Sequence, residues 1–303
     1  MDLSIIILNY NSRDYLKKCV ESIGKSNIGN YQYEVIVVDN CSTDDSIKLA
    51  KQSKILNTKY LILNTNQGFA HGNNQGLKEI NPKTRFVLFL NPDTIVQKYT
   101  FKKMIEFFDN NKDVDAATCQ IDLALTGKMQ PECHRGFPTP WNSLCHFSGL
   151  SKLFPNSKLF SGYFLGHLDK SVPHQIDACV GAFLMVKRGV GNKVKWWNEK
   201  YFFYGEDLDF CYQLKQQNFN LYFNPNCKIT HFQGVCSGLI SKSKHLSKAS
   251  RETKIKVAKA STQAMRIFYQ ENLFKNYSSF VRRLVMFGIK LLEIQRVFKA
   301  KYL

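Results

Sequence analysis

The sequence has no hydrophobic run close to the length of a membrane-spanning helix. Although 44% of its 303 residues are hydrophobic, no apolar stretch approaches the roughly 18 residues that a spanning helix requires, so we expect no transmembrane helix. The first residues, MDLSIIILNYN, carry an acid where a signal peptide would carry basic residues, and their apolar run is too short for one. We therefore expect a cytoplasmic protein with a globular core that includes many of the 23 Phe and 14 Tyr residues.

Several motifs of familiar enzyme classes are also missing. The nine cysteines include no CxxC pair and no zinc-ligand spacing, so we expect reduced, mostly buried thiols. No GxGxxG follows the first predicted strand and no GxxxxGKS or GxxxxGKT occurs, which argues against a dinucleotide dehydrogenase and a P-loop enzyme. The lack of a GxSxG elbow argues against a serine hydrolase.

Acidic residues are scarce relative to basic ones. The chain has 24 Asp and Glu against 42 Lys and Arg, a net charge of +18, which favours an anionic partner such as a phosphorylated ligand or an anionic membrane surface. Residues 242–303 alone carry 15 basic residues and three Glu. No recognised module gathers basic and aromatic residues on one face, so we do not expect a nucleic-acid-binding protein.

Buried strands alternate with amphipathic helices through the first third of the chain. This alternation predicts an α/β fold with a mostly parallel sheet, whose strand C-terminal ends share the edge where ligands bind. We predict strands over 3–11, 33–42, 59–66, 85–93, 175–188 and 219–232, and helices over 12–26, 42–53, 68–80, 99–111 and 206–218. Residues between 111 and 174, rich in Pro, Gly and Ser, favour irregular structure of the kind that often holds substrates.

Polar residues end each of the first four predicted strands. They are Asn9, Tyr10 and Asn11; Asp39 and Asn40; Asn64 and Asn66; and Asn91, Pro92 and Asp93. Each cluster alone fits the turn preferences of Asn and Asp. Four clusters at the same edge favour a binding site.

Two of these strand ends suggest a metal site and a phosphate site. Asp93 follows a Pro-stiffened turn and could ligate a hard divalent cation, with His231 as a second ligand, although a lone His is more often a packed residue. Gly68, Gly72 and Gly76 recur every four residues and form a helical stripe without side chains. The stripe suits either close approach of a diphosphate at a helix N-terminus or tight helix–sheet packing.

Acids and aromatic rings are neighbours in YFFYGEDLDFCYQLK, residues 201–215. Glu206 and Asp207 fall in the first turn of a predicted helix, where the helix dipole stabilises negative charge, and acids are common there. The aromatic residues beside them reduce hydration. A poorly hydrated but ionised carboxylate suits a general base.

The order of these motifs resembles the family 2 glycosyltransferases of the GT-A fold, and most of all their rhamnosyltransferase-like branch. The similarity runs from residue 4 to about residue 237. Its segments are SIIILNYNS, EVIVVDNCSTDDS, NQGFAHGNNQG, VLFLNPDT, DACVGAFLMVKR, FFYGEDLDFCYQLK and THFQGVCS.

The resemblance implies an inverting transfer of a sugar from a nucleoside diphosphate donor to a hydroxyl, with Mg²⁺ or Mn²⁺ as cofactor. Asp207 would be the catalytic base, Glu206 would contact acceptor or donor, and Asp93 with His231 would bind the metal. The donor site would include Asn9, Tyr10, Asn11, Asp39, Asn40, Asn66, Gly68, Asn73 and Asn91.

Two departures from the family pattern affect the site. Asn91 stands where many relatives carry the first Asp of a DxD motif, which leaves fewer charged metal ligands. The stretch KVKWWNEKYFF replaces a Gly-Gly-Phe-Asp-Glu pattern, so Trp196 and Trp197 are expected to reshape the acceptor pocket, with Tyr204 also in contact with the acceptor.

The same resemblance suggests partners and domains. The donor would be dTDP-rhamnose or a UDP-sugar, and the acceptor a saccharide or a lipid-linked carrier in cell-surface polysaccharide synthesis. Residues 1–237 would form the catalytic domain, with a nucleotide-sugar half (1–110) and an acceptor half (111–237). Residues 238–303 would form a basic, amphipathic helical segment that either lies on the inner face of the membrane or packs as a lid.

Two other functions stay open at this point. A nucleotidyltransferase has a similar sheet but usually carries a Gly-rich, basic loop after the first strand, which NYNSRDY is not. A non-catalytic protein that binds a nucleotide sugar or another anionic ligand would be indicated by loss of Asp93 or Asp207, and both are present.

Overall fold

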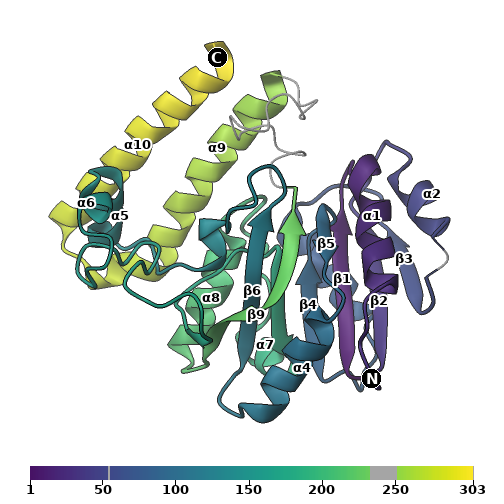
Figure 1. Cartoon of the computed structure of the whole chain (residues 1–303). Helices are drawn as coiled ribbons and strands as arrows, with labels where there is room; N and C mark the ends of the chain where they lie inside the picture. The colour runs from purple at the N-terminus through teal and green to yellow at the C-terminus, as the bar shows by residue number, and fades with distance from the viewer. Residues whose placement is uncertain (54, 233–250, 303) are drawn as a thin grey trace.

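The computed structural model describes residues 1–53, 55–232 and 251–302. Over these residues the chain forms a 9-stranded sheet flanked by helices, and two long helices stand beside the sheet's second half (Figure 1). The α/β prediction is therefore confirmed. The predicted domain boundary at residue 237 lies outside the described residues, so it stays a prediction.

The first half of the chain builds one side of the sheet from parallel strands. Parallel ladders join β3 to β2, β2 to β1 and β1 to β4, as the alternating pattern predicts. The elements are β1 (Leu3–Asn9), α1 (Arg13–Gly24), β2 (Tyr33–Asp39), α2 (Ser46–Lys51), β3 (Thr58–Ile62), α3 (Phe69–Lys78), β4 (Phe86–Leu90), β5 (Thr94–Val96) and α4 (Thr100–Asn110).

The second half makes the sheet mixed rather than mostly parallel. Strand β8 pairs antiparallel with both β4 and β6, and β5 and β7 pair antiparallel with β9, while β6 and β9 are parallel. The elements are β6 (Ala116–Leu123), a short turn (Pro131–Cys133), α5 (Pro140–Phe147), α6 (Leu150–Leu153), β7 (His174–Gln175), β8 (Phe183–Lys187), α7 (Arg188–Val194), α8 (Glu206–Gln216) and β9 (Leu221–His231).

The core lies on both faces of the central strands. Ile5, Ile6 and Ile7 are fully buried, as are Leu88 and Phe89, because helices cover both faces of a sheet built this way. Burial of large apolar side chains on this scale is the main favourable term in folding.

Helix α3 approaches the sheet closely because its inner positions lack side chains. A Cβ atom at Gly76 would lie 2.8 Å from Ile6 and 2.9 Å from Val38, and one at Gly72 would overlap Leu8. The alternative of tight helix–sheet packing is thus correct for these two glycines. They face the core and leave no open stripe for a diphosphate.

A short turn between the C-terminal helices is hydrogen-bonded to helix α8. Helix α9 (Arg251–Phe268) continues into a π-helical turn (Tyr269–Leu273) and then into α10 (Ser279–Tyr302). Asn272 in that turn accepts a hydrogen bond from the Tyr212 hydroxyl at its carbonyl oxygen (2.9 Å) and donates its amide to Asp209 (2.6 Å). Helix α10 is the last element of the described residues.

The cysteines in the described ranges are all free, and all but the half-buried Cys41 are buried. The expectation of reduced, mostly buried thiols is confirmed for this part of the chain. No helix in the described residues combines the length and apolarity needed to cross a bilayer.

Candidate active site

The ends of β1 and β2 share one hydrogen-bonded polar cluster. Asn9 is fully buried, and its side-chain amide donates to Asp39 Oδ1 (2.6 Å), Ser42 Oγ (3.0 Å) and Ser46 Oγ (2.8 Å). The Ser42 amide in turn donates to Asp39 Oδ2 at 3.1 Å. The cluster fixes the Asp39 carboxylate at the carboxyl end of β2, where the sheet topology predicts a ligand.

Tyr10 and Asn11 continue from this cluster toward the surface. Tyr10 is 46% exposed, and Asn11 adopts a left-handed backbone with φ of 49°, which Asn tolerates better than most residues. The Asn11 Oδ1 atom accepts the Thr43 amide at 2.8 Å. This pair closes the two strand ends and leaves the Tyr10 ring accessible to a ligand.

Asn40 links the second strand to the loop before α3. Its Nδ2 donates to Asn66 Oδ1 (2.9 Å) and to the Gly68 carbonyl (3.3 Å), and Asn66 Oδ1 also accepts the Gly68 amide (3.0 Å). Asn73, by contrast, is 1% exposed and donates to the Phe69 carbonyl inside its own helix. Asn40, Asn66 and Gly68 therefore contact one another, whereas the Asn73 side chain points into the protein interior.

Gly68 sits where the donor-side loop touches the aromatic segment. Its φ of +96° is a conformation that L-residues rarely adopt, and a Cβ there would overlap the Phe202 carbonyl oxygen. The same carbonyl accepts the Phe69 amide at 3.1 Å. Gly68 is thus needed for contact between two protein segments.

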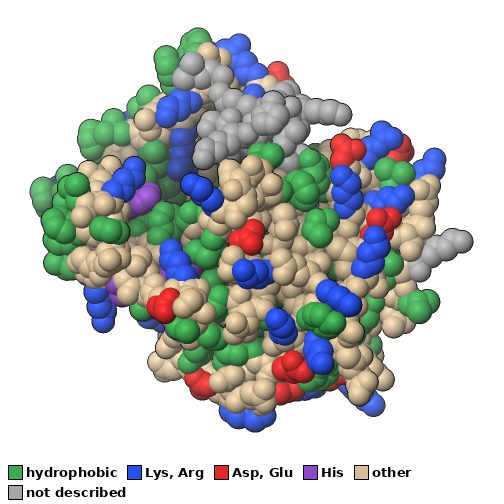
Figure 2. Space-filling view, in the orientation of Figure 1, with side chains coloured by type: hydrophobic (Ala, Val, Ile, Leu, Met, Phe, Trp, Pro, Cys, Tyr) green, Lys and Arg blue, Asp and Glu red, His purple; other side chains and the backbone are tan. Residues whose placement is uncertain are grey.

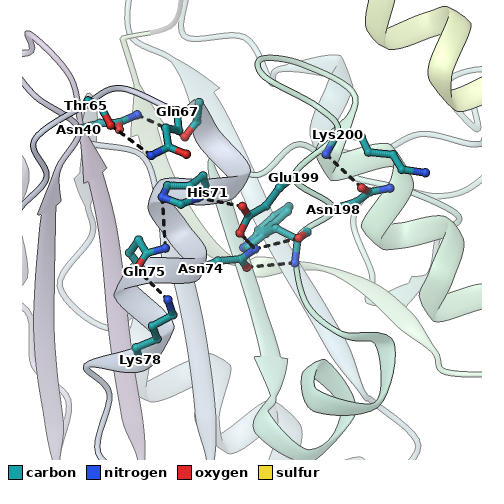
Figure 3. Close-up of polar contacts among 12 residues, drawn as sticks. Asn40, Thr65, Gln67, His71, Asn74, Gln75, Lys78, Asn198, Glu199 and Lys200 are labelled. Carbon is teal, nitrogen blue, oxygen red and sulfur yellow. Dashed lines mark hydrogen bonds and ion pairs between the residues drawn. The ribbon is translucent and has the colours of Figure 1, made fainter.

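A second network ties α3 to the segment that precedes the aromatic residues (Figure 3). Asn74 exchanges hydrogen bonds with the Trp197 backbone, donating to its carbonyl (2.9 Å) and accepting its amide (3.3 Å), and also donates to Glu199 Oε1 (2.8 Å). His71 Nδ1 lies 2.8 Å from Glu199 Oε2. These contacts fix residues 197–199 against α3, so the two sides of the candidate site are held together.

Asp93 and His231 meet at the carboxyl edge, as predicted. His231 Nε2 lies 3.1 Å from Asp93 Oδ1, and both side chains are buried. His231 Nδ1 lies 2.8 Å from Gln130 Oε1, which can accept a hydrogen bond from it, and the opposite ring nitrogen, Nε2, faces Asp93. Asn91 Nδ2 is 3.5 Å from the same Nε2 atom.

This geometry fits a divalent cation. Two ligands about 2.1 Å from one ion and at right angles to each other lie about 3 Å apart, which is close to the separation observed. The described residues contain no group of three or more His, Cys, Asp and Glu that could hold a metal. Water and diphosphate oxygens would therefore complete the shell, which is how Mg²⁺ usually binds.

Asp207 lies in the first turn of α8, facing an arginine that the sequence did not indicate. Arg135 Nη2 is 3.4 Å from Asp207 Oδ2, with side chains 13% and 14% exposed. The Asp207 Oδ1 atom accepts the Leu208 amide at 2.7 Å. Both a cation and a backbone donor therefore contact this carboxylate.

Glu206 differs from its neighbour in charge state. It is 7% exposed and its Oε2 atom has no hydrogen-bond partner. Burial, reinforced by the nearby Asp207 charge, raises the pKa of Glu206 to about 8. A carboxyl group with this pKa is mostly protonated near neutral pH and can donate a hydrogen bond.

The third acid of this segment, Asp209, has a structural role. It accepts hydrogen bonds from Asn272 (2.6 Å), the Tyr201 hydroxyl (3.3 Å) and Asn198 (3.3 Å). Asp209 therefore fastens the turn that carries α9 and α10 to the start of α8. Tyr201, at 1% exposed, is part of the core.

The two tryptophans pack inward instead of lining an open pocket. Trp197 is 2% exposed, with its ring 4.7 Å from Phe89 and 5.1 Å from Phe210. Trp196 is half-buried, lies 5.8 Å from Phe89, and donates Nε1–H to Asn192. This packing does not favour the acceptor role predicted for them, which stays a prediction.

Tyr204 is better placed for that role. It is half-buried, has a left-handed φ of 70°, and immediately precedes Gly205 and the acids of α8. Its ring lies 4.2 Å from that of Phe203. An aromatic surface beside the carboxylates is thus retained, but it comes from residues 202–204.

Sequence reasoning missed Arg135, which contacts Asp207, and Gln130, which contacts His231. Both lie in the stretch classed as irregular. Gln130 is fully buried, and Arg135 is held by paired backbone hydrogen bonds with Ala178. A buried Arg needs an acidic partner, but its partner is 72 residues away, so no local pattern signals it.

An open, basic cavity of about 640 Å³ lies apart from these residues. Lys103, Lys170 and Lys228 line it together with Gln120 and Asn226. None of the predicted site residues contributes to it. The candidate active site is therefore defined by its side-chain contacts rather than by this cavity.

Comparison with known proteins identifies the family of the chain. A family model described as "Glycosyl transferase family 2" matches residues 4–174, more than half of the chain. The hexosyltransferase Agl10 of low-salt glycan biosynthesis in Haloferax volcanii is 28% identical over 224 residues, which is 73% of this chain and 64% of that protein. Rhamnosyltransferase WbbL of Escherichia coli K12 is 26% identical over 236 residues, covering 75% of this chain and 82% of WbbL.

Solved structures share the fold at low sequence identity. S. aureus TarS 1–349 has a TM-score of 0.54 at 18% identity, over 98% of this chain and 81% of that one. GalNAc-T7 with UDP, GalNAc and Mn²⁺ has a TM-score of 0.60 at 16% identity, over 90% of this chain and 49% of that one. Together with the family match, these likenesses lead to one conclusion: the chain belongs to glycosyl transferase family 2 and is a glycosyltransferase of the GT-A fold.

Proposed function

We propose that this glycosyltransferase transfers a sugar from a nucleoside diphosphate sugar to a hydroxyl of a saccharide or lipid-linked acceptor, with inversion at the anomeric carbon. The donor is dTDP-rhamnose or a UDP-sugar, and the product belongs to cell-surface polysaccharide synthesis. The name of WbbL supports rhamnose, and the complex of TarS with UDP-GlcNAc supports a UDP-sugar.

The observation that carries the proposal is the pairing of Asp93 with His231. Their facing oxygen and nitrogen atoms, 3.1 Å apart, suit one Mg²⁺ or Mn²⁺ ion. When bound, such an ion supplies positive charge to the leaving diphosphate. A mannosyltransferase from Pyrobaculum calidifontis, crystallised with GDP-Man and Mn²⁺, has a TM-score of 0.57 at 12% identity, over 98% of this chain and 72% of that one.

The residues at the carboxyl ends of β1 and β2, with the loop before α3, would bind the donor. Asp39, held by Asn9 and Ser42, would accept hydrogen bonds from the ribose or base, and the exposed Tyr10 ring would lie beside them. Asn40, Asn66 and Gly68 shape the adjacent loop. The buried amide of Asn73 is left out of the proposed donor site.

Asp207 acts as the general base. Its carboxylate takes the proton of the acceptor hydroxyl as that oxygen forms a bond to the anomeric carbon. The bond from the anomeric carbon to the diphosphate breaks, and its electron pair leaves with the diphosphate. Arg135 keeps Asp207 oriented and charged, and the protonated Glu206 donates a hydrogen bond to donor or acceptor.

A donor-hydrolysis panel tests this proposal. Purified protein is incubated with Mg²⁺ or Mn²⁺ and a set of nucleotide sugars, and released nucleoside diphosphate is measured. We expect metal-dependent release from one donor, lost in Asp93→Ala and Asp207→Asn but kept in Asp113→Asn, a change in an acid on the loop before β6. No release from any donor, together with no nucleotide binding by calorimetry, would overturn the proposal.

The two alternatives give different results in the same panel. A nucleotidyltransferase would release inorganic diphosphate from a nucleoside triphosphate and a sugar phosphate. A non-catalytic binder would bind a nucleotide sugar with unchanged affinity after Asp207→Asn and would release nothing. We also propose that the protein works in the cytoplasm at the inner face of the membrane, where a lipid-linked acceptor would be found.

A further inference from the structure

Helix α10 presents an apolar stripe to solvent along its length. Phe280, Leu284, Phe287, Leu291, Ile294 and Phe298 recur every three or four residues and are each 52–70% exposed. Side chains at this spacing share one face of a helix. An unbroken row of large apolar side chains on a soluble surface normally marks an interaction site.

The opposite side of α10 is already occupied. Ile289 is 3% exposed within the core cluster, Arg266 of α9 forms an ion pair with Glu293, and Arg296 donates to Ser261 of α9 at 2.8 Å. Helix α9 therefore fixes the orientation of α10. The apolar stripe is the side that this packing leaves bare.

A second exposed apolar group belongs to α5 and α6. Trp141, Leu144 and Phe147 share one side of α5 and are 44–60% exposed; Leu153 at the end of α6 and Phe154 just after it are 74% and 49% exposed. In Figure 1 these short helices lie beside the start of α10, and in Figure 2 green side chains follow the edge of the molecule where α5, α6 and α10 lie. We call the exposed apolar side chains of α5, α6 and α10 the docking face.

Contacts from the π-helical turn hold the two parts of the docking face together. The Tyr269 hydroxyl lies 3.2 Å from Ser143 Oγ on α5 and donates to the Pro138 carbonyl just before it. His146 of α5 stacks on Tyr163 at 4.4 Å. Helix α5 is therefore attached to the same turn that leads into α10.

The exposed charges of α10 have one sign. Arg283, Lys290, Lys299 and Lys301 are exposed on α10, whose one acid, Glu293, is paired with Arg266. Residues 133–168, which include α5 and α6, contain no Asp or Glu. A partner that fits must accept large apolar side chains and also supply negative charge.

An anionic lipid surface meets both conditions, and a second copy of this chain does not. A symmetric dimer through this face would bring two basic rims together, which like-charge repulsion opposes. A lipid interface takes up the apolar stripe while its anionic headgroups pair with Lys and Arg. No helix in the described ranges can span the bilayer, so the contact would be interfacial.

We propose that α10 and the α5–α6 pair form one docking face by which the protein lies on an anionic lipid bilayer. The proposal deepens the proposed function, on which it rests for the identity of the acceptor. Arg296, on the inner side of α10, is close enough to Tyr163 and Tyr204 for both to raise its pKa, against the lowering by burial. Because Tyr204 belongs to the aromatic segment before Glu206, this part of α10 lies near the point where a lipid-linked acceptor would enter.

Vesicle sedimentation with the purified full chain tests the docking face. We expect binding to vesicles of phosphatidylcholine with phosphatidylglycerol and much weaker binding to phosphatidylcholine alone. Phe287→Gln/Leu291→Gln and Phe147→Gln/Leu153→Gln should each weaken binding at least about tenfold, because each removes two large apolar side chains. Lys290→Gln/Lys299→Gln should weaken it about 25-fold, since each basic residue contributes about fivefold.

Matched controls change equally exposed residues at the far side of the sheet. Leu56→Gln/Ile62→Gln alters side chains that are 82% and 52% exposed, and Lys48→Gln/Lys51→Gln alters two exposed lysines of α2. Both should bind vesicles as the wild type does. Equal loss in face and control variants, or no wild-type binding, would overturn the proposal.

Two further readouts separate the remaining outcomes. Sedimentation velocity would detect a dimer, and a dimer abolished by Phe287→Gln/Leu291→Gln would replace the lipid surface with a second copy. Donor hydrolysis measured without vesicles should be unchanged in the variants of the docking face. Vesicle binding without any donor hydrolysis and without nucleotide binding would refute the proposed function but leave the docking face standing.

Discussion

The guanidinium of Arg135 lies 3.4 Å from the Asp207 carboxylate, and each side chain is less than one-sixth exposed. The two residues come from distant segments that meet only in the folded chain. Removing water strengthens an interaction between opposite charges. Arg135 therefore places a positive charge beside Asp207, whereas burial raises the pKa of the adjacent Glu206.

Substitution of Asp207 should affect the reaction rate, and substitution of Asp209 the free energy of unfolding. We expect Asp207→Asn to lower the rate of sugar transfer at least about 100-fold with donor affinity retained, since asparagine keeps an acceptor oxygen for Arg135. Asp209→Ala, two residues on, should instead lower the free energy of unfolding by about 3 kcal/mol, because three hydrogen-bond donors lose their acceptor. Steady-state kinetics and urea unfolding of both variants check this. Full activity in Asp207→Asn would contradict its role.

Gln130 should control metal affinity without touching the substrate. Gln130→Leu leaves the His231 Nδ1–H without its acceptor, and loss of such a partner typically lowers metal affinity about 10- to 100-fold. We expect a higher Mn²⁺ requirement but a near-normal rate at saturating Mn²⁺, measured by metal titration of donor hydrolysis. Gln120→Leu, on β6 with its side chain hydrogen-bonded to Asp122, is the control. An unchanged Mn²⁺ requirement in Gln130→Leu would remove Gln130 from the metal site.

Glu206 should make stability depend on pH. Its pKa rises from 4.5 to about 8 on folding, so the folded state holds a proton that the unfolded state releases between these values. The contribution of Glu206 is therefore fully present below about pH 4.5 and is lost as pH rises through about 8. Glu206→Gln should flatten this decline, so its advantage over the wild type should be larger at about pH 9 than at about pH 5.

Thermal unfolding across pH checks the Glu206 prediction. The exposed Glu252 on α9 provides the matched control, Glu252→Gln, for which the difference from the wild type should not change in the same way. An equal difference at both pH values for Glu206→Gln would show that Glu206 is ionised in the folded protein near neutrality.

Gly68 should be intolerant of any side chain. Gly68→Ala adds a Cβ against the Phe202 carbonyl and forces a left-handed φ, which we expect to cost about 2 to 3 kcal/mol of unfolding free energy. The aromatic segment should also shift and raise the KM for the donor. Gly189→Ala, in helix α7 with open space around it, should be neutral or stabilising by about 0.5 kcal/mol. Equal stability of the two variants would contradict the close contact.

The first half of the fold was predictable because its signals are local. Runs such as Leu3–Asn9 and Tyr33–Asp39 are apolar throughout, and a continuous apolar run between turns is typical of a strand buried on both faces. The polar residues that end these strands do cluster, and Asp93 meets His231 as expected. Local pattern and final position agree there.

The second half depends on contacts that no short pattern encodes. The stretch 175–188 looked like one strand, but only Phe183–Lys187 joins β4, and His174–Gln175 pairs elsewhere with β9. Trp197 was assigned to the acceptor from its place in the chain, yet Phe89 and Phe210 enclose it. Arg135 and Gln130 become meaningful only when strands distant in sequence bring them to their partners.

Placement of β8 between β4 and β6 has a consequence for how the protein is made. Until Phe183–Lys187 leave the ribosome, β4 has an unpaired edge of buried apolar residues. Nearly 100 residues separate the two strands, and at about 5–20 residues per second the wait lasts roughly 5–20 seconds. The nascent chain is therefore exposed to edge-to-edge aggregation during synthesis, and expression should depend on chaperones that bind it during that interval.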